Sequence, residues 1–369
     1  MRVGVLLNPI AGFGGALALH GTDALPADRF DDAVGEGRAG RRLVRALTVL
    51  DRRAADVELL AAPGILGSDA MTAAGVAHTV LDMPSPRRTT RRDTVDAARR
   101  LVEEGADLLV FAGGDGTATD LAETVGLSVP TIGVPSGVKM HSEVFSRSPE
   151  AAGRLLVAAV AGRARMEPAE VLDVGPGGES GVVGMLRVPR WHEPLQGAKT
   201  SAPPAASAVA GRAVARVLVP AADPRTTWII GPGATVGAVA EVLGMDATLR
   251  GVDVRHPDGR VEPDVTEDRL FALACAAEHP LLVLGVVGGQ GFLLGRGNQQ
   301  LSPRVVAAIG PDRVHILATQ EKVGALFPPV LLLDTDSGSA GGPHPLLGYR
   351  RVLTGGRDST VLRVVDAAA

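Results

Sequence analysis

One carboxylate flanked by glycines has the clearest chemical meaning in this sequence. The segment Gly113-Gly114-Asp115-Gly116-Thr117 follows an apolar run, Leu108 to Ala112, and precedes a helical pattern from Ala118. Glycines let the backbone approach a ligand closely, and a helix start offers free N–H groups and a positive dipole end that favour phosphate. The negative charge of an aspartate there would repel an anion that has no counter-ion. We therefore interpret Asp115 as a group that either holds a metal or accepts a proton from a hydroxyl. This combination predicts phosphoryl transfer, with the carboxylate facing an open crevice.

A second glycine-rich turn follows the first predicted strand. Asn8-Pro-Ile-Ala-Gly12 comes directly after the apolar residues 2–7, and its turn would expose backbone amides beside the Asp115 loop. This turn does not match G-x-G-x-x-G, and the chain contains no G-x-x-x-x-G-K-[ST] motif, so the chemistry is not that of a Walker-type kinase. A plain turn between a strand and a helix is the alternative interpretation.

The loop after residues 129–134 carries polar side chains that could join the same site. Lys139 could neutralise phosphate charge, and Ser142 could donate a hydrogen bond. His141 could titrate near neutral pH, although a hydrogen-bonded structural histidine is the commoner case.

The second half of the chain has two candidate binding loops. Gly231-Pro-Gly233-Ala-Thr235 lies between a predicted strand and a predicted helix, which is a suitable arrangement for an anion. The segment from Gly288 to Gln300 is dense in glycine and amide side chains, and its Gln290, Arg296 and Asn298 could recognise ribose hydroxyls or base edges. Simple loop flexibility is the alternative for this segment.

The elements that would position these residues alternate between strands and helices. In the first half, five predicted strands alternate with predicted helices at residues 38–51, 90–104 and 148–162. Such alternation predicts a doubly wound parallel sheet, in which ligands bind at loops that follow the carboxyl ends of strands. The pattern returns from residue 226, and residues 350–365 predict a hairpin.

We therefore predict an α/β protein in three parts. Residues 1–164 would form a Rossmann-like nucleotide- and phosphate-binding domain, residues 165–335 a second lobe and residues 336–369 a C-terminal β-hairpin tail. Within the second lobe, residues 165–200 indicate a short antiparallel β segment before an α/β part. Residues 198–213 are typical of a linker or a loose helix.

Composition excludes several classes of function. The formal net charge of −4 and the aromatic content of 3% disfavour binding to nucleic acid. Cys275 is the only cysteine, which excludes an internal disulfide, and its apolar neighbours predict a core position. The sequence shows neither a signal peptide nor an apolar stretch long enough for a bilayer, so we expect a cytoplasmic protein without a membrane partner. We expect small-molecule nucleotides as partners, and a homo-oligomer.

Four of these motifs resemble the ATP-NAD kinase family, which belongs to one superfamily with diacylglycerol and sphingoid kinases. Residues 8–12 are similar to its Asn-Pro-x-x-Gly turn, and Gly113 to Gly116 are similar to its Gly-Gly-Asp-Gly hallmark. Together with Gly137 to Ser142 and Gly289 to Gln300, they resemble most the ATP-NAD kinase-like branch, which includes accessory proteins of acetoin utilisation. The motifs are spread over about residues 1–320.

The resemblance implies a phosphotransferase that uses ATP or polyphosphate, Mg²⁺, and NAD as acceptor at its adenosine 2′-hydroxyl, giving NADP. It implies that Asp115 takes or orients the hydroxyl proton, and that Gly114, Gly116 and Thr117 hold donor phosphates with Gly12 opposite. The chain lacks the Asn-Glu pair that binds the NAD ribose in ordinary members of the family. The sequence of its second half also differs from the pattern of their β-rich NAD domain. Two alternatives therefore stay open, a kinase of a lipid or sugar and a nucleotide-binding accessory protein without turnover.

Overall fold

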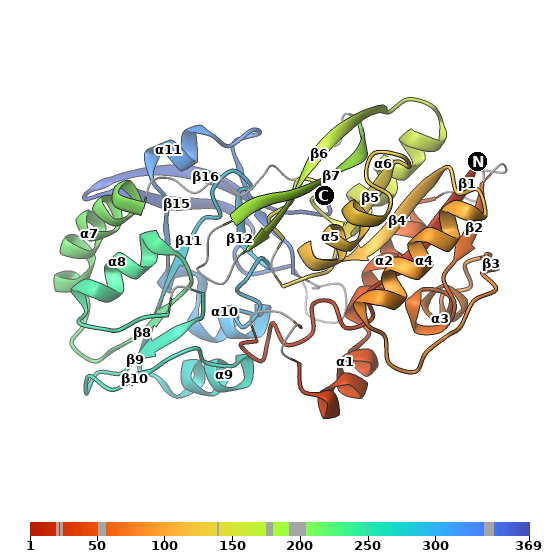
Figure 1. The fold of residues 1–369 in the computed structure, drawn as a ribbon. Helices are drawn as coiled ribbons and strands as arrows, with labels where there is room; N and C mark the ends of the chain where they lie inside the picture. The colour runs from red at the N-terminus through yellow and green to blue at the C-terminus, as the bar shows by residue number, and fades with distance from the viewer. Residues whose placement is uncertain are drawn as a thin grey trace. The chain divides into compact units, whose positions relative to one another are not determined.

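The computed structural model describes residues 1–19, 22, 25–50, 57–138, 140–174, 180–191, 204–248, 250–335 and 343–369. The chain forms two compact units (Figure 1). Unit 1 comprises Met1–Phe13, Gly21–Ala198 and Ala368, and unit 2 comprises Gly14–His20, Lys199–Ala367 and Ala369. The predicted α/β class is confirmed, with a parallel N-terminal sheet, a short antiparallel sheet and a second, mixed sheet.

The sheet of unit 1 has five parallel strands in the order β3-β2-β1-β4-β5. The strands are β1 (Arg2–Leu7), β2 (Glu58–Ala61), β3 (Thr79–Val80), β4 (Leu108–Gly113) and β5 (Thr131–Pro135). After β3 the chain returns to the other side of β1 and adds β4 there. The strand order therefore reverses between β1 and β4, and in sheets of this kind ligands bind beyond the carboxyl ends of the strands at such a point.

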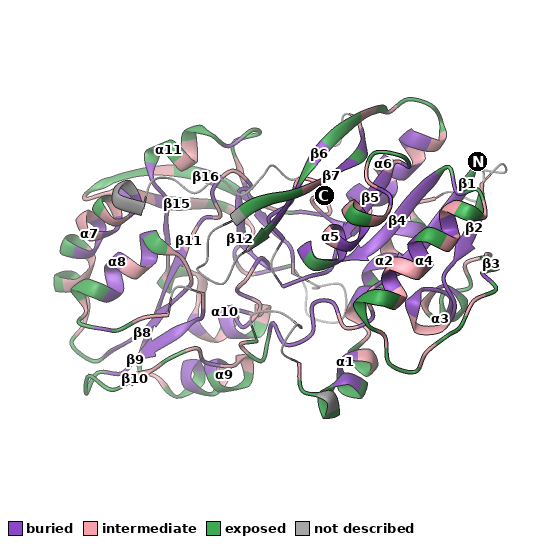
Figure 2. Cartoon of the chain, in the orientation of Figure 1, coloured by how far each residue is buried: buried purple, intermediate pink, exposed green. Residues whose placement is uncertain are grey.

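Burial explains why the sequence of β4 is an uninterrupted apolar run. All six residues of β4 are buried, and Figure 2 shows the strand buried along its length. A parallel strand covered on both faces needs apolar side chains on both, rather than the alternation of a half-exposed strand.

Helices of unit 1 follow the predicted segments closely where local signals are strong. At α4, Thr90 and Asp93 form a capping box, and at α6 the Ser148 side chain accepts a hydrogen bond from the Ala151 N–H. Two helices, α1 and α3, and two short 3-10 turns were not predicted. The helical elements are η1 (Ala27–Arg29), α1 (Phe30–Glu36), α2 (Arg38–Thr48), η2 (Gly64–Leu66), α3 (Ser68–Ala73), α4 (Arg91–Glu103), α5 (Asp115–Thr124) and α6 (Pro149–Val160).

An antiparallel hairpin completes unit 1. Its strands are β6 (Arg165–Val174) and β7 (Ser180–Arg190). Ala169, Val171 and Leu186 of this hairpin are buried in the same hydrophobic core as β1 and β4. The compact units therefore differ from the predicted parts, in which the hairpin belonged to the second lobe, because the sequence does not reveal which core a short hairpin packs against.

The sheet of unit 2 has nine strands in the order β10-β9-β8-β11-β13-β15-β16-β14-β12. They are β8 (Thr226–Ile230), β9 (Asp253–Arg255), β10 (Val261–Glu262), β11 (His279–Gly285), β12 (Phe292–Leu294), β13 (Val314–Leu317), β14 (Val330–Leu333), β15 (Gly348–Gly355) and β16 (Asp358–Asp366). The predicted hairpin β15–β16 is confirmed, but it is not a separate tail. It is inserted into the sheet, because β15 pairs in parallel with β13 and β16 in parallel with β14.

The structure decides two expectations about unit 2. Of the two alternatives for residues 198–213, a linker or a loose helix, the described part supports the helix, because it belongs to the 18-residue helix α7 (Pro204–Ala221). Cys275 is exposed rather than buried, because α9 turns Leu270, Leu273 and Ala274 towards the core and the next position points away.

The remaining helices are α8 (Ala234–Val242), α9 (Glu267–Ala276), α10 (Pro303–Ile309), η3 (Pro311–Arg313) and α11 (Gln320–Gly324). Within the described ranges, every helix is too short or too polar to traverse a bilayer.

Candidate active site

Three loops of unit 1 meet at the carboxyl edge of its sheet. In the register of β1 and β4, Leu7 pairs with Ala112, and the Asn8 N–H donates to the Ala112 carbonyl at 2.9 Å. The Gly113 carbonyl in turn accepts hydrogen bonds from the N–H groups of Ser136 at 3.0 Å and Gly137 at 2.9 Å, in the loop after β5. The predicted Asn8, Asp115 and Lys139 loops are therefore neighbours, although Lys139 itself lies outside the described residues.

Asn8 connects its own turn to the start of α5. Its Oδ1 accepts from the Ile10 N–H at 3.2 Å, and its Nδ2 donates to Thr117 Oγ1 at 3.5 Å, the outer limit of a hydrogen bond. The first contact makes Asn8 a turn residue, and the second aligns that turn with the helix that begins at Asp115.

The glycines of these loops have different roles. Gly12 has φ of +84°, and a Cβ there would lie 2.2 Å from the Ser136 carbonyl oxygen. A Cβ at Gly113 would lie 2.5 Å from Thr117 Oγ1, so both glycines are required by close packing. At Gly116 a Cβ would meet nothing within 4 Å among the described residues. The first turn of α5 is therefore open on that side.

The helix α5 offers unpaired amides at its start. Gly114 is its N-cap and provides no side-chain cap, and at this end the Ala118 N–H donates to the Gly114 carbonyl at 3.1 Å. The N–H groups of the preceding positions have no partner within the helix. A phosphate can accept hydrogen bonds from such groups and also gains from the helix dipole.

The Asp115 carboxylate faces residues 141 and 142 of the loop after β5. Its Oδ2 accepts from the His141 N–H at 2.7 Å. Its Oδ1 accepts from the Ser142 N–H at 3.0 Å and from Ser142 Oγ at 2.6 Å. Asp115 is only 8% exposed, whereas we expected it to face an open crevice. The difference arises because its hydrogen-bond donors lie 26 and 27 residues further along the chain, where no local pattern reveals them.

Burial also changes the acidity of this carboxylate. Loss of solvation raises the pKa of Asp115 to about 6, although the hydrogen bonds from Ser142 Oγ and from the amides of His141 and Ser142 act in the opposite direction. The negative charge of Asp173 on β6 raises the pKa further. A carboxyl group with a pKa near the working pH is suited to accept a proton and to release it again.

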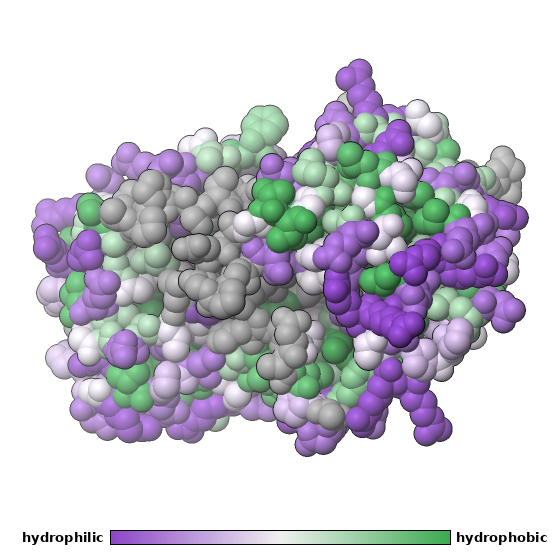
Figure 3. Space-filling model, in the orientation of Figure 1, coloured by the Kyte–Doolittle hydropathy of each residue, from purple (hydrophilic) through white to green (hydrophobic). Residues whose placement is uncertain are grey.

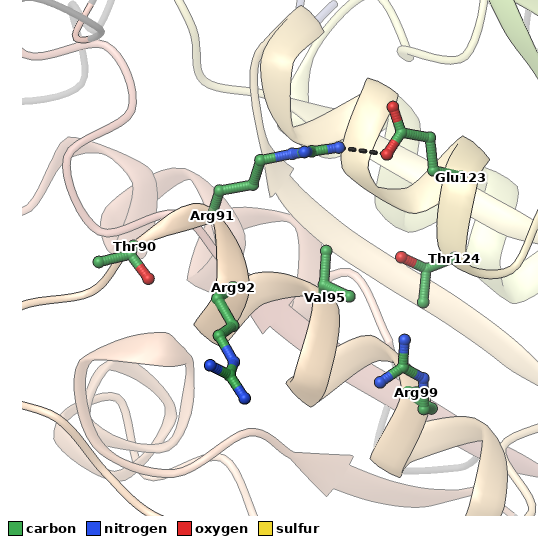
Figure 4. A pocket seen from close by; sticks show the side chains of 7 residues that line it. All are labelled: Thr90, Arg91, Arg92, Val95, Arg99, Glu123 and Thr124. Atoms are coloured by element: carbon green, nitrogen blue, oxygen red, sulfur yellow. Dashed lines mark hydrogen bonds and ion pairs between the residues drawn. The ribbon is translucent and has the colours of Figure 1, made fainter.

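Arg91, the first residue of α4, lies beside the later part of α5 rather than its start. Arg91 forms ion pairs with Asp120 and Glu123, while Arg92 and Arg99 approach Asp96 at 3.5 and 3.4 Å. Figure 3 shows hydrophilic side chains gathered over α4. A depression of about 600 Å³ lies between these helices and is lined by Thr90, Arg91, Arg92, Val95, Arg99, Glu123 and Thr124 (Figure 4).

In unit 2, the turn between β8 and α8 is joined by a lysine that the sequence did not indicate. Gly233 has φ of +114° and is the N-cap of α8, and Thr235 is 3% exposed. Lys322 Nζ donates to Thr235 Oγ1 at 3.3 Å and to the Val286 carbonyl at 3.4 Å. Lys322 is 87 residues from Thr235 in the sequence and lies on the short helix α11, so only the fold brings the two together.

The other predicted residues of unit 2 are buried, and Arg296 and Asn298 form contacts within the unit. Arg296 forms a 3.0 Å ion pair with Asp334, and its guanidinium lies 4.3 Å from the centroid of the Phe292 ring. Asn298 Oδ1 accepts from the Gly295 N–H at 2.9 Å, and Gln290 is 5% exposed. Contacts of Arg296 and Asn298 thus fix their own loop, and ligand recognition by these three side chains stays a prediction.

The described residues contain no group of three or more His, Cys, Asp or Glu side chains placed to hold a metal ion. Mg²⁺ in nucleotide enzymes commonly needs only one or two carboxylates, because substrate phosphates and water complete its octahedron.

The fold and the site define a class of protein: an α/β protein with a glycine-flanked carboxylate at the point where its parallel sheet reverses strand order. A family model described as the ATP-NAD kinase N-terminal domain matches residues 29–164, and one described as the ATP-NAD kinase C-terminal domain matches residues 226–343. The chain belongs to the ATP-NAD kinase family. Neither a curated protein nor a solved structure gives a significant match.

The second match corrects an expectation. The second half was not expected to resemble the family's β-rich NAD domain, yet the model of the C-terminal domain matches residues 226–343, which contain most of a nine-stranded sheet. Its strands are short and separated by glycine-rich loops and helices, which is why the sequence looked like a second α/β domain. The matched ranges include Asp115 and the predicted residues of unit 2, whereas Asn8 and Gly12 precede them.

Proposed function

We propose that this chain transfers a phosphoryl group from ATP to the 2′-hydroxyl of NAD, giving NADP and ADP. Membership of the ATP-NAD kinase family supports the kinase class. The observation that carries the proposal is the position of Asp115, at the first turn of α5 and at the strand-order reversal, with a pKa raised to about 6. Fold kinship alone would not identify a substrate.

In the proposed reaction, Asp115 accepts the proton of the 2′-hydroxyl. The hydroxyl oxygen forms a bond to the γ-phosphorus, the bond from that phosphorus to the β–γ bridging oxygen breaks, and ADP leaves. Amides of Gly114, Gly116 and Thr117 would bind the donor phosphates, with Gly12 on the opposite side. Because phosphoryl transfer needs little covalent chemistry from the protein, positioning and charge stabilisation would supply most of the rate. Mg²⁺, when bound, would neutralise charge on the phosphates.

The donor and the acceptor can be tested together. Purified full-length chain would be incubated with Mg²⁺ and either ATP or polyphosphate, each with NAD, NADH, a sugar panel or diacylglycerol, and the products identified by mass spectrometry. Phosphorylated NAD is the expected product. Product formed only from a sugar or a lipid would keep the kinase class and overturn the NAD assignment.

A second candidate function is nucleotide binding without turnover, as in an accessory protein. The observation that favours it is the burial of Asp115, whose two oxygens already accept hydrogen bonds within unit 1. Binding of ATP and NAD measured by calorimetry, with no phosphorylated product under any of these conditions, would select this candidate.

A further inference from the structure

A single buried serine connects Asp115 to the hairpin β6–β7. Ser142 has no exposed surface, and its Oγ lies 2.6 Å from Asp115 Oδ1. The same Oγ accepts from the Leu172 N–H at 3.0 Å and lies 3.2 Å from the Leu172 carbonyl oxygen. Leu172 belongs to β6, so the hydroxyl lies between a helix start and a strand that are far apart in the sequence.

Counting lone pairs shows which oxygen of Asp115 already has both of its hydrogen-bond acceptor positions filled. A carboxylate offers about four acceptor positions, two on each oxygen. On Oδ1 both are filled, by the N–H and the hydroxyl of Ser142. On Oδ2 the described residues fill one, through the His141 N–H. Among the described residues, Oδ2 therefore keeps one acceptor position that a substrate hydroxyl can use.

We propose that Ser142 is the positioning residue for Asp115: it fixes Oδ1 so that Oδ2 is the oxygen that accepts the proton. This inference rests on the proposed function. The proton moves from the 2′-hydroxyl to Oδ2 while the hydroxyl oxygen bonds to phosphorus, and Ser142 gains and loses no proton.

The two acceptors beside the Ser142 hydroxyl make this role compatible with both states of Asp115. While the carboxylate is ionised, the hydroxyl donates to Oδ1, which is the shorter contact. Once Oδ2 is protonated, Oδ1 is a weaker acceptor, and the hydroxyl can turn to the Leu172 carbonyl at 3.2 Å. The buried Ser142 hydroxyl therefore has a hydrogen-bond acceptor in both protonation states of Asp115.

Other charged groups near the carboxylate act on it from different elements. His141, in the same loop as Ser142, has its Nδ1 3.7 Å from Oδ2. Asp173 on β6 repels the ionised form. Among these neighbours, the Ser142 hydroxyl is the strongest of the influences that favour the ionised carboxylate. Its removal should therefore make Asp115 a weaker acid.

The test is Ser142→Ala in the full chain, with Ser146→Ala as the matched control. Ser146 lies in the same loop, is 1% exposed, and its Oγ has no hydrogen-bond partner among the described residues. The measurements are the pH profile of kcat/KM for NADP formation, and kcat and KM at the optimum. Ser142→Ala should move the acid limb to higher pH by about one unit and lower kcat roughly tenfold or more, with KM little changed.

Ser146→Ala should leave the acid limb in place. If the alanine variant at position 142 does not fold, Ser142→Cys replaces the hydroxyl by a much weaker donor of similar size and should shift the limb in the same direction. An active wild type whose acid limb is the same after Ser142→Ala or Ser142→Cys overturns this inference alone. A wild type that forms no phosphorylated NAD overturns the proposed function and this inference together.

Discussion

Replacing Asp115 by asparagine should change how the stability of unit 1 depends on pH. In the folded chain, burial raises the pKa of Asp115 from 3.8 to about 6. The stabilising contribution of the protonated group is therefore fully present below pH 3.8 and is lost as the pH rises through about 6. Asparagine has no charge at any of these pH values, so the variant lacks this dependence.

The size of this effect on the free energy of unfolding follows from the two pKa values of Asp115. The pKa is about 6 in the folded chain and 3.8 in the unfolded chain, a difference of roughly 2. At about 1.4 kcal/mol per unit, the ionised carboxylate costs about 3 kcal/mol at neutral pH relative to its acid form. About half of this, roughly 1.5 kcal/mol, should be lost between about pH 5 and about pH 7.5. Other carboxylates titrate alike in both proteins, so the difference between wild type and variant isolates Asp115.

The assay can be restricted to one unit. The two tryptophans, Trp191 and Trp228, lie in different units, so Trp228→Phe leaves Trp191 to report on unit 1. Urea denaturation of this background, with and without Asp115→Asn, would be followed by fluorescence across the same pH range. The free energy of unfolding of the aspartate form minus that of the asparagine form should fall as the pH rises. A difference that stays constant would refute the raised pKa.

Two further predictions concern the close packing of a glycine in unit 1 and a buried ion pair in unit 2. Gly12→Ala should destabilise unit 1 by about 1–3 kcal/mol, because φ of +84° is strained for alanine and the Cβ would lie 2.2 Å from the Ser136 carbonyl oxygen. Gly116→Ala should not destabilise it, and equal urea midpoints for the two variants would contradict this reasoning. Arg296→Met should destabilise unit 2 by about 3–5 kcal/mol because it breaks the buried 3.0 Å ion pair with Asp334. The double variant with Asp334→Leu should recover most of that loss, and strict additivity in the double-mutant cycle would contradict it.

Structural features that depend only on residues adjacent in the sequence could be predicted from the sequence. The apolar run of β4, the capping box of Thr90 and Asp93, and the Ser302 cap of α10 are all local signals, and each is present. The position of Asp115 at a strand-to-helix turn follows from the same signals.

Features that depend on distant pairing could not be predicted. The donors to Asp115 come from the loop after β5, and the partner of Arg296 is Asp334 on another segment. The insertion of the hairpin β15–β16 between β13 and β14 is also invisible in the sequence, because a hairpin carries no signal for the sheet that receives it. Lys322 was missed for the same reason.

The most direct test of the proposed proton acceptor is the turnover of Asp115→Asn beside that of Asp120→Asn. Asp120 lies on the same helix and pairs with Arg91. Asp120→Asn therefore makes the same chemical change at a position outside the proposed reaction site. With fold verified by circular dichroism and ATP binding retained, Asp115→Asn should lower kcat for NADP formation by about 10²-fold or more. Asp120→Asn should stay close to wild type. An Asp115→Asn chain that makes NADP at nearly the wild-type rate would contradict the account.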